Sequence, residues 1–136
     1  MQSDDPAYLL DTNIILRFLL ADDPNQSQKA RTLMANIAGG QVLAEVKDFI
    51  ILELTWVLES SCYVPRQEIA DKLINILNFS GIVNSNRATL IQALLNYKKT
   101  RIDLADCLLA AYSAPDTPVF SFDKDLKRLG AHLGSI

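Results

Sequence analysis

The sequence predicts an α/β fold with a mostly parallel sheet. Short apolar runs that suit strands alternate with longer segments in which apolar residues recur at helical spacing. Turn-forming residues separate many of these segments, and we find no internal repeat, low-complexity tract or linker. A chain of 136 residues with this organisation predicts a single domain over residues 1–136.

Two helices are expected after the first strand. The apolar run at residues 8–10 predicts the strand, and the apolar spacing through residues 14–20 predicts a helix. The Asp-Asp-Pro segment at residues 22–24 should end this helix. A second helix is expected over residues 25–37, because the glycines at 39–40 suit the position just after a last helical turn.

The middle of the chain predicts one short strand and two further helices. Residues 41–46 alternate as a strand does, and residues 48–61 have the apolar character of a buried helix. Proline at position 65 suits the start of another helix that runs to residue 78. The apolar face of that helix is expected at Ile69, Leu73, Ile76 and Leu77.

The last part of the chain returns to alternating strands and helices. A brief strand is expected at residues 82–83, and residue 85 or 86 should cap the helix that follows. Residues 103–113 predict a short helix rich in Ala and Leu. Residues 119–122 form the clearest strand pattern after the first, and residues 123–129 predict a last helix.

Bulk composition indicates an ordered globular protein. Apolar residues make up 49% and charged residues 21% of the chain. No apolar run approaches the roughly 20 residues that cross a bilayer, and the N-terminus lacks the layout of a signal peptide. We therefore expect a cytoplasmic protein without a membrane partner. Cys62, Cys107 and the single His132 form neither a disulfide framework nor a zinc motif.

Four acidic residues interrupt apolar segments where a core would favour apolar side chains: Asp11, Glu53, Asp106 and Asp123. A carboxylate that leaves water costs free energy unless it is paired, protonated or bound to a metal. Two of the four follow predicted strands, and ligands gather at the carboxyl ends of parallel strands. We therefore expect the fold to collect these acids into one cluster that binds a hard divalent cation.

Each of these acids also has a structural explanation. Asp11 and Asp123 can cap the helices that follow them, which is a common use of Asp. Glu53 lies in the middle of a predicted helix, on a face with Phe49, Ile50 and Val57, so it cannot be a cap. It would instead need a buried Arg or Lys partner, or a helix with a second wet face.

Two positions in the acidic set have neighbouring competitors. Asp103 is a candidate cap for the helix that carries Asp106, and it becomes a fifth acid of the cluster if it points inward. Asp125 competes with Asp123, although it can also simply favour the positive end of the last helix.

The net charge of −3 argues mildly against a large, non-specific surface for nucleic acid. It does not exclude a nuclease, because a bound metal offsets part of the negative charge. Basic residues also lie near the acids in sequence, and they are candidates for contacting phosphates, although a solvated helix face explains them as well. They are Lys98, Lys99 and Arg101 in one group and Lys124, Lys127 and Arg128 in another.

The order of these motifs resembles that of PIN-domain proteins, in particular the small VapC-type toxins of bacterial toxin–antitoxin pairs. The matching segments are residues 9–16, 53–58, 106–111 and 120–126, so the resemblance covers nearly the whole chain. Its most specific part is Asp-Thr-Asn after the first strand. The family often has Thr two residues before the last acid, and here Ser121 keeps the hydroxyl.

This resemblance implies a Rossmann-like three-layer α/β/α sandwich and a ribonuclease that depends on Mg²⁺ or Mn²⁺. It places the catalytic and metal-binding acids at Asp11, Glu53, Asp106 and Asp123. Supporting roles would fall to Thr12, Asn13, Asp103, Ser121 and Asp125. Metal ions held by carboxylates can bind a phosphodiester and activate water for in-line attack on RNA. A lone histidine makes a histidine-based mechanism a poor fit.

The resemblance also implies partners. A toxin of this kind would be bound by a small antitoxin protein, and members of the family commonly form homodimers. An apolar helix surface could serve either contact, although its residues are more often core residues. The candidate surface comprises Trp56, Leu73, Ile76, Leu77 and Phe79.

Two other function classes fit parts of the sequence. A non-catalytic member of the same fold could bind RNA or protein without cutting. A metal-dependent phosphatase also carries an Asp after its first strand, but enzymes that resemble the haloacid dehalogenases usually have Asp-x-Asp there. Position 13 is Asn, which argues against that class. The sequence does not identify the RNA.

Overall fold

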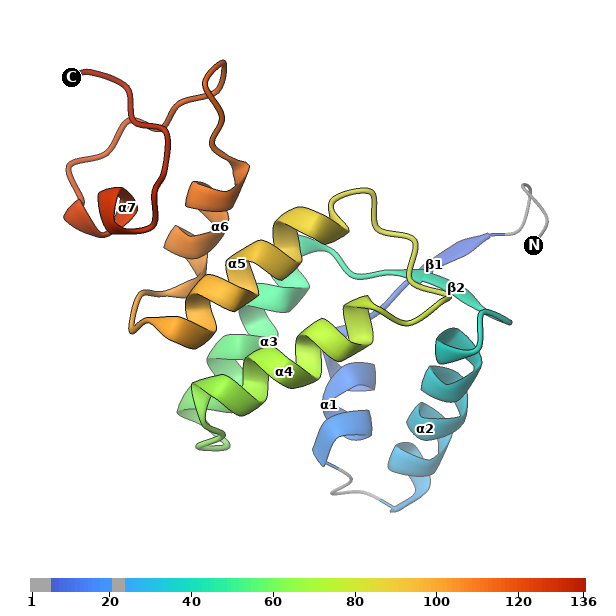
Figure 1. The fold of residues 1–136 in the computed structure, drawn as a ribbon. Coiled ribbons are helices and arrows are strands. Elements are labelled where there is room, and N and C mark those ends of the chain that lie inside the picture. The colour runs from blue at the N-terminus through green and yellow to red at the C-terminus, as the bar shows by residue number, and fades with distance from the viewer. Residues whose placement is uncertain (1–5, 21–23) are drawn as a thin grey trace.

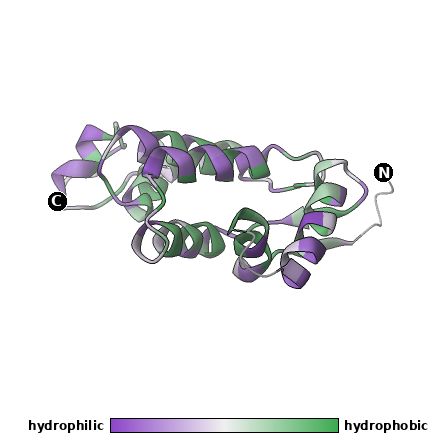
Figure 2. Cartoon of the chain, turned by 90° about the horizontal axis from the view of Figure 1, so that it is seen from below, coloured by the Kyte–Doolittle hydropathy of each residue, from purple (hydrophilic) through white to green (hydrophobic). Residues whose placement is uncertain are grey.

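A computed structural model describes residues 6–20 and 24–136 (Figure 1). These residues form seven helices and a parallel sheet of two strands, which confirms the predicted α/β class. The molecule is elongated, and the N-terminal strand and the C-terminal segment lie at opposite ends in two perpendicular views (Figures 1 and 2). None of the described helices is long and apolar enough to cross a membrane.

The sheet joins two of the predicted strands. β1 (Ala7–Leu9) pairs in parallel with β2 (Leu43–Glu45), with Tyr8 opposite Ala44. The predicted strand at residues 82–83 is reduced to a single bridge between Ala44 and Ile82. Because this bridge lies on the far side of β2, β1 is an edge strand within the part of the chain that is described.

Two helices follow β1 as predicted. α1 (Thr12–Leu20) and α2 (Pro24–Ala38) pack on each other, and residues 22 and 23 of the predicted break lie outside the described residues. α2 buries Ser27, Ala30, Met34 and Ile37, whose spacing of three and four places them on one face. The helix ends at Ala38, and Gly40 follows in the left-handed conformation, with a φ of 84° that glycine adopts at no steric cost.

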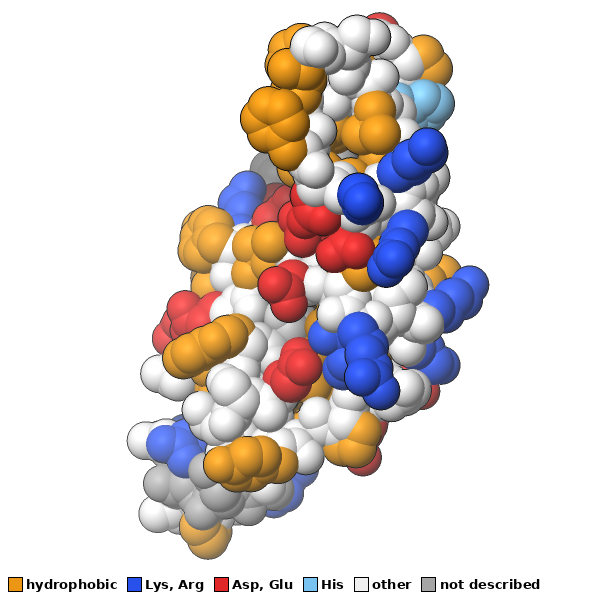
Figure 3. All heavy atoms as spheres, turned by 90° about the vertical axis from the view of Figure 1, so that its left-hand side faces the viewer, with side chains coloured by type: hydrophobic (Ala, Val, Ile, Leu, Met, Phe, Trp, Pro, Cys, Tyr) orange, Lys and Arg blue, Asp and Glu red, His pale blue; other side chains and the backbone are white. Residues whose placement is uncertain are grey.

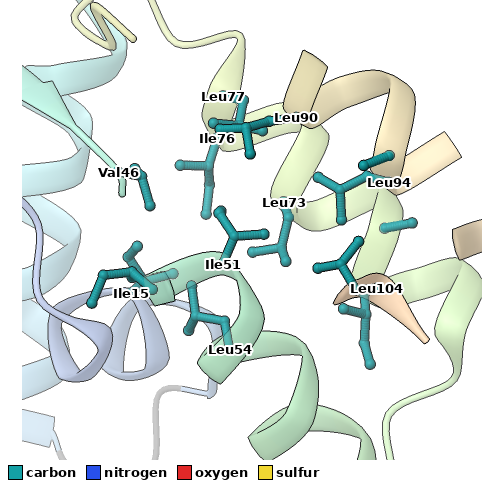
Figure 4. Packing of buried hydrophobic residues seen from close by; sticks show 14 of the residues in the cluster. Ile15, Val46, Ile51, Leu54, Leu73, Ile76, Leu77, Leu90, Leu94 and Leu104 are labelled. Carbon is teal, nitrogen blue, oxygen red and sulfur yellow. The ribbon is translucent and has the colours of Figure 1, made fainter. Parts of the chain in front are cut away.

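Four helices form the centre of the molecule and agree closely with prediction: α3 (Asp48–Ser60), α4 (Arg66–Leu77), α5 (Arg87–Lys99) and α6 (Leu104–Tyr112). They pack with α1 around one large hydrophobic core (Figure 4). Residues from every one of these helices and from the end of β2 enter it: Ile15, Val46, Ile51, Leu54, Leu73, Ile76, Leu77, Leu90, Leu94 and Leu104.

The C-terminal segment departs from prediction. α7 (Lys124–Arg128) forms where a last helix is expected. Residues 119–122, however, do not form a strand, and that prediction is wrong for this structure: only Val119 pairs, in a single bridge to Leu133. Strand pairing needs a neighbouring edge along its length, and the free edge of β1 lies at the other end of the molecule (Figure 1). Ala110, Val119 and Leu126 instead make a small separate core.

Candidate functional site

A group of negative charges surrounds Asp106, which lies in the first turn of α6 and is half-buried. Burial raises the pKa of the Asp106 carboxyl, and the nearby charges of Asp123, Asp103 and Asp125 raise it further. The packing of α7 against α6 therefore brings two of the four predicted acids, Asp106 and Asp123, close to their two competitors, Asp103 and Asp125.

Asp123 is held by a tight turn before α7. Its side chain accepts a hydrogen bond from the backbone N–H of Asp125 at 2.9 Å, which is the capping role that its position predicts. Its own backbone N–H donates to Ser121 Oγ, also at 2.9 Å. Asp125 forms an ion pair with Arg128 at 3.5 Å. The two competing acids thus have different roles in the turn, and Ser121 fixes its geometry.

Asp103 occupies the N-cap position of α6, but its side chain makes no capping hydrogen bond. The prediction that Asp103 occupies the cap position is confirmed, but its side chain does not form the capping hydrogen bond. Its exposed carboxylate instead contributes to the field around Asp106.

Asp11 lies between β1 and α1 and is exposed. The next residue, Thr12, is buried, and its hydroxyl has no hydrogen-bond partner among the described residues. Asn13 is exposed on the first turn of α1. Thr12 is thus the buried member of this pair of candidate supporting residues.

Glu53 is exposed, so the first of its two structural explanations, a buried Arg or Lys partner, does not apply. It lies on the outer face of α3, which is exposed at Phe49 and Trp56 as well. The residues that fill the core from α3 are Ile50, Ile51, Leu54, Thr55 and Leu58. α3 therefore has a second, solvent-exposed face, which was the other structural explanation for Glu53. An exposed Glu53 needs no buried cation as a partner.

The four acids do not form one cluster in this structure, contrary to prediction. Asp11, Glu53 and Asp123 are exposed, and only Asp106 is half-buried. Among residues 6–20 and 24–136, no three side chains of His, Cys, Asp or Glu lie close enough together to hold a metal ion. Residues 119–122 do not pair with β1 in this structure, so Asp11 and Asp123 do not follow neighbouring strands of one sheet. The assignment of these acids to a site stays a prediction.

Basic side chains lie beside the acidic ones on the face that is seen from the C-terminal side (Figure 3). Lys99, Arg101 and Lys124 are exposed. Lys98 forms an ion pair with Asp71 of α4 at 2.6 Å. The predicted phosphate contacts thus include three exposed cations and one that is paired within the protein.

Sequence reasoning did not identify the polar network at the end of α6. The Asn86 side chain does not cap α5 but donates to Asp48 at 2.7 Å, and the Tyr112 hydroxyl donates to the other Asp48 oxygen at 2.5 Å. Burial and the hydrogen bond to Asp48 raise the pKa of Tyr112. No sequence signal pairs these residues, because they come from three separate helices or caps.

A pocket of about 430 Å³ also opens between α3, α5 and α6. The sequence indicated Asp103 and Trp56 among its lining residues but gave no sign that they meet. The others in the lining include Thr55, Glu59 and Tyr97.

The predicted apolar contact surface is mostly wrong. Leu73, Ile76 and Leu77 are buried in the main core. Phe79 is half-buried and packs edge-on against Phe18, with ring centroids 6.4 Å apart. Of the five residues, only Trp56 is an exposed apolar side chain.

A comparison with models of protein families matches the PIN domain over residues 8–131. Searches of curated proteins and of solved structures gave no match. The PIN family consists mostly of metal-dependent nucleases. Its domain extends here from β1 to beyond α7 and includes all four predicted acids, and the chain belongs to the PIN-domain family.

Proposed function

We propose that this protein is a metal-dependent endoribonuclease that hydrolyses phosphodiester bonds in RNA, with Mg²⁺ or Mn²⁺ as cofactor. Membership of the PIN family supports a nuclease. The observation that carries the proposal is the surroundings of Asp106, whose carboxyl has a raised pKa because it is half-buried and faces Asp123, Asp103 and Asp125. Such a concentration of carboxylates is stabilised by a bound divalent cation.

The proposed ion ligands are Asp11, Glu53, Asp106 and Asp123. Their chemistry suits Mg²⁺ or Mn²⁺, since all four supply carboxylate oxygens. Their spacing in this conformation does not suit one ion, because no three acidic, His or Cys side chains of the described chain converge. The proposed activity therefore requires at least three of these carboxylates to converge when the ion binds. The exposed Lys99, Arg101 and Lys124 would contact phosphates of the RNA.

The biological role that we propose is that of the toxin in a toxin–antitoxin pair of the VapC type. An antitoxin protein would then cover the site, and the toxin would act as a homodimer in the cytoplasm, where RNA is available. The exposed face of α3 with Phe49 and Trp56 is the part of the predicted contact surface that remains accessible. The sheet of the described residues has two strands. The complete three-layer α/β/α sandwich, with a larger sheet between two layers of helices, is therefore also part of what we propose.

A second function is favoured by one observation. A non-catalytic PIN domain that binds RNA or protein needs no assembled ion site, and the described residues contain none. In that case the acids would contribute only to surface charge.

Cleavage of a panel of structured and single-stranded RNAs tests the proposal. Wild type should cut at least one RNA with Mg²⁺ or Mn²⁺ and should stop cutting with EDTA. Asp11→Asn and Asp106→Asn should each remove the activity. Asp116→Asn makes the same chemical change in an exposed turn and should cut like wild type. Cutting that persists in both site variants would show that the activity lies elsewhere, and no cutting of any RNA by a folded protein would favour the binding module.

A further inference from the structure

The pocket of about 430 Å³ lies where α6 packs on both α3 and α5 (Figure 1). Its lining places a large aromatic side chain beside two carboxylates. Trp56 is 68% exposed, and Glu59 and Asp103 are exposed as well. An accessible indole offers a flat apolar face, and the carboxylates offer hydrogen-bond acceptors. The pocket therefore suits a flat ligand whose edge carries hydrogen-bond donors.

The two carboxylates of the pocket differ in what they already bind. Glu59 is held by its neighbours: one oxygen accepts a hydrogen bond from the Tyr97 hydroxyl at 2.7 Å, and the other lies 3.5 Å from the Arg66 guanidinium. The Asp103 carboxylate does not cap α6, and it has no hydrogen-bond or ion-pair partner within the described part of the chain. Both oxygens of Asp103 are therefore available to a ligand.

The pocket adjoins the acids of the proposed nuclease site on two helices. Trp56 follows Glu53 by three residues on α3, and Asp103 precedes Asp106 by three residues at the start of α6. Residues three apart are neighbours on a helix surface, and the charge of Asp103 acts on Asp106. A nucleotide held in the pocket would thus have its phosphates close to the proposed ion ligands, a step that rests on the proposed function.

The surrounding charges favour a nucleotide over a cationic peptide. The carboxylates of the pocket repel phosphate, whereas Lys99 and Arg101 are exposed just outside it, at the end of α5 and in the connection that leads to Asp103. A nucleotide can place its base inside the pocket and its phosphates against these cations. A guanidinium group from a peptide would also be flat and rich in donors, but the same two cations would repel the chain that carries it.

We propose that this pocket binds a guanine base of the RNA substrate. The base stacks on the Trp56 indole, and its N1–H and 2-amino groups donate to the two oxygens of Asp103. Guanine is the one RNA base with two adjacent donors on its pairing edge. Adenine and cytosine have an acceptor nitrogen next to the amino group, and uracil has a single N–H between two carbonyls. The pocket thereby selects which nucleotide lies next to the proposed cleavage site.

Trp56 is the single tryptophan of the chain, so its fluorescence reports on the pocket directly. The probe is a short oligouridylate that carries one guanosine, in EDTA so that metal-dependent cutting does not occur. It should quench Trp56, and a probe with 7-deazaguanosine should bind equally well, because it retains both donors. Probes with inosine, which lacks the 2-amino group, with adenosine or with uridine alone should bind about tenfold more weakly or worse. Equal affinity for the guanosine and inosine probes, or no binding of either, would overturn the proposal.

Substitution of Asp103 tests the edge contacts. Asp103→Asn should still show quenching of Trp56 but should lose the preference for guanosine over inosine, because an amide presents one acceptor oxygen instead of two. Asp116→Asn makes the same change in an exposed turn and should keep the preference. A preference that persists in Asp103→Asn would overturn the role of this carboxylate.

Substitution of Trp56 tests the stacking. Trp56→Leu keeps an apolar side chain without a flat ring, and it should weaken binding of a fluorescein-labelled guanosine probe about tenfold by anisotropy. Tyr63→Leu removes an exposed ring from the loop after α3 and should bind like wild type. Both substitutions are at exposed positions, so circular dichroism should show the wild-type fold. Wild-type affinity in Trp56→Leu would overturn the stacking.

Addition of Mg²⁺ separates this proposal from the nuclease itself. Wild type should then cut the guanosine probe at a bond next to the guanosine. If the probe binds with the expected preference and stays intact, the nuclease proposal fails and the guanine pocket stands. If RNA is cut without any preference for guanine, the pocket proposal fails and the nuclease stands. Trp56 fluorescence that responds to protein concentration but to no oligonucleotide would also overturn the pocket, because it would assign this face to a contact between proteins.

Discussion

The carboxylate of Asp123 accepts a hydrogen bond from the backbone N–H of Asp125 at 2.9 Å and so caps α7. The two acids that compete in the sequence therefore divide the roles between them. Asp123→Ala removes the cap and should lower stability by about 1 kcal/mol. Asp123→Ser keeps an oxygen at the cap and should stay within a few tenths of a kcal/mol of wild type. Thermal unfolding of the two variants measures the difference.

Substitutions at Asp123 and Asp125 distinguish an effect on stability from an effect on activity. Asp123→Ser retains the cap but lacks the negative charge, so it should fold like wild type and lose metal-dependent cleavage of RNA. Asp125→Ser should retain most of the activity, because Asp125 forms an ion pair with Arg128 and its backbone alone supports the cap. Loss of activity in Asp125→Ser with full activity in Asp123→Ser would assign the fourth acid to Asp125.

Asp106 should make stability depend on pH. Burial, and then the charges of Asp123, Asp103 and Asp125, raise the pKa of its carboxyl above the ordinary value of 3.8. Between the ordinary and the raised pKa, the folded state binds more protons than the unfolded state, so the free energy of unfolding falls as pH rises through this interval. Asp106→Asn removes this loss, and it should be more stable than wild type at neutral pH without added metal.

Urea unfolding between pH 3.5 and 7, in EDTA, measures this effect. The gap between Asp106→Asn and wild type should open as pH rises and should then stay constant. Asp116→Asn, in the exposed turn after α6, should follow the wild-type curve. A gap between Asp106→Asn and wild type that does not change with pH would show that neither burial nor the neighbouring carboxylates disfavour the ionised form of Asp106.

Local sequence patterns predicted the helices well. The buried residues of α2, α4 and α5 recur at spacings of three and four, and Gly40, which follows the end of α2, has the left-handed conformation that its position predicts. These features depend on neighbours within a few residues along the chain. The cap by Asp123 belongs to the same class and was predicted correctly.

Features that depend on distant segments were not predictable in this way. Residues 119–122 have the composition of a strand, but a strand also needs the edge of another strand to pair with. The free edge of β1 lies at the other end of the molecule (Figure 1), so no sheet forms at these residues. Glu53 was expected on an apolar face because it shares that face with Phe49, Ile50 and Val57, and no local pattern shows that Phe49 stays exposed. Convergence of the acids depends on both of these placements, so the arrangement of the predicted acids could not be read from local sequence patterns.

Arg66 should contribute more to stability than any other cation of α4. Its guanidinium donates to the carbonyl of Tyr97 at 3.1 Å and to that of Ile102 at 2.5 Å, and it lies 3.8 Å from the centre of the Tyr97 ring. A lysine cannot reproduce this planar set of donors. Arg66→Lys should therefore lower the free energy of unfolding by about 1–3 kcal/mol, because one ammonium group cannot replace the donors that reach both the Tyr97 and the Ile102 carbonyl.

Urea unfolding at neutral pH checks this expectation. Arg31→Lys makes the same change on an exposed position of α2 and should stay within about 0.5 kcal/mol of wild type. Tyr97→Phe gives a second measure of the same network, since it removes the hydroxyl that donates to Glu59 at 2.7 Å. Equal stability of Arg66→Lys and Arg31→Lys would mean that the helix contacts do not depend on the guanidinium.

The two cysteines should differ in reactivity. Cys107 is buried in the main core, whereas Cys62 is half-exposed after α3. Burial raises the pKa of the Cys107 thiol to about 11, from an ordinary value of 9.0. At neutral pH an aromatic disulfide reagent should thus modify Cys62 quickly and Cys107 only after unfolding, because the thiolate is the reactive form.

The buried Cys107 thiol should also make stability depend on pH. Between about pH 9 and 11 the thiol of Cys107 loses its proton in the unfolded chain and keeps it in the folded chain, so the free energy of unfolding should fall as pH rises. Cys107→Ala should lack that part of the alkaline loss, and rapid modification of both thiols in the folded protein would show that α6 does not stay packed in the core.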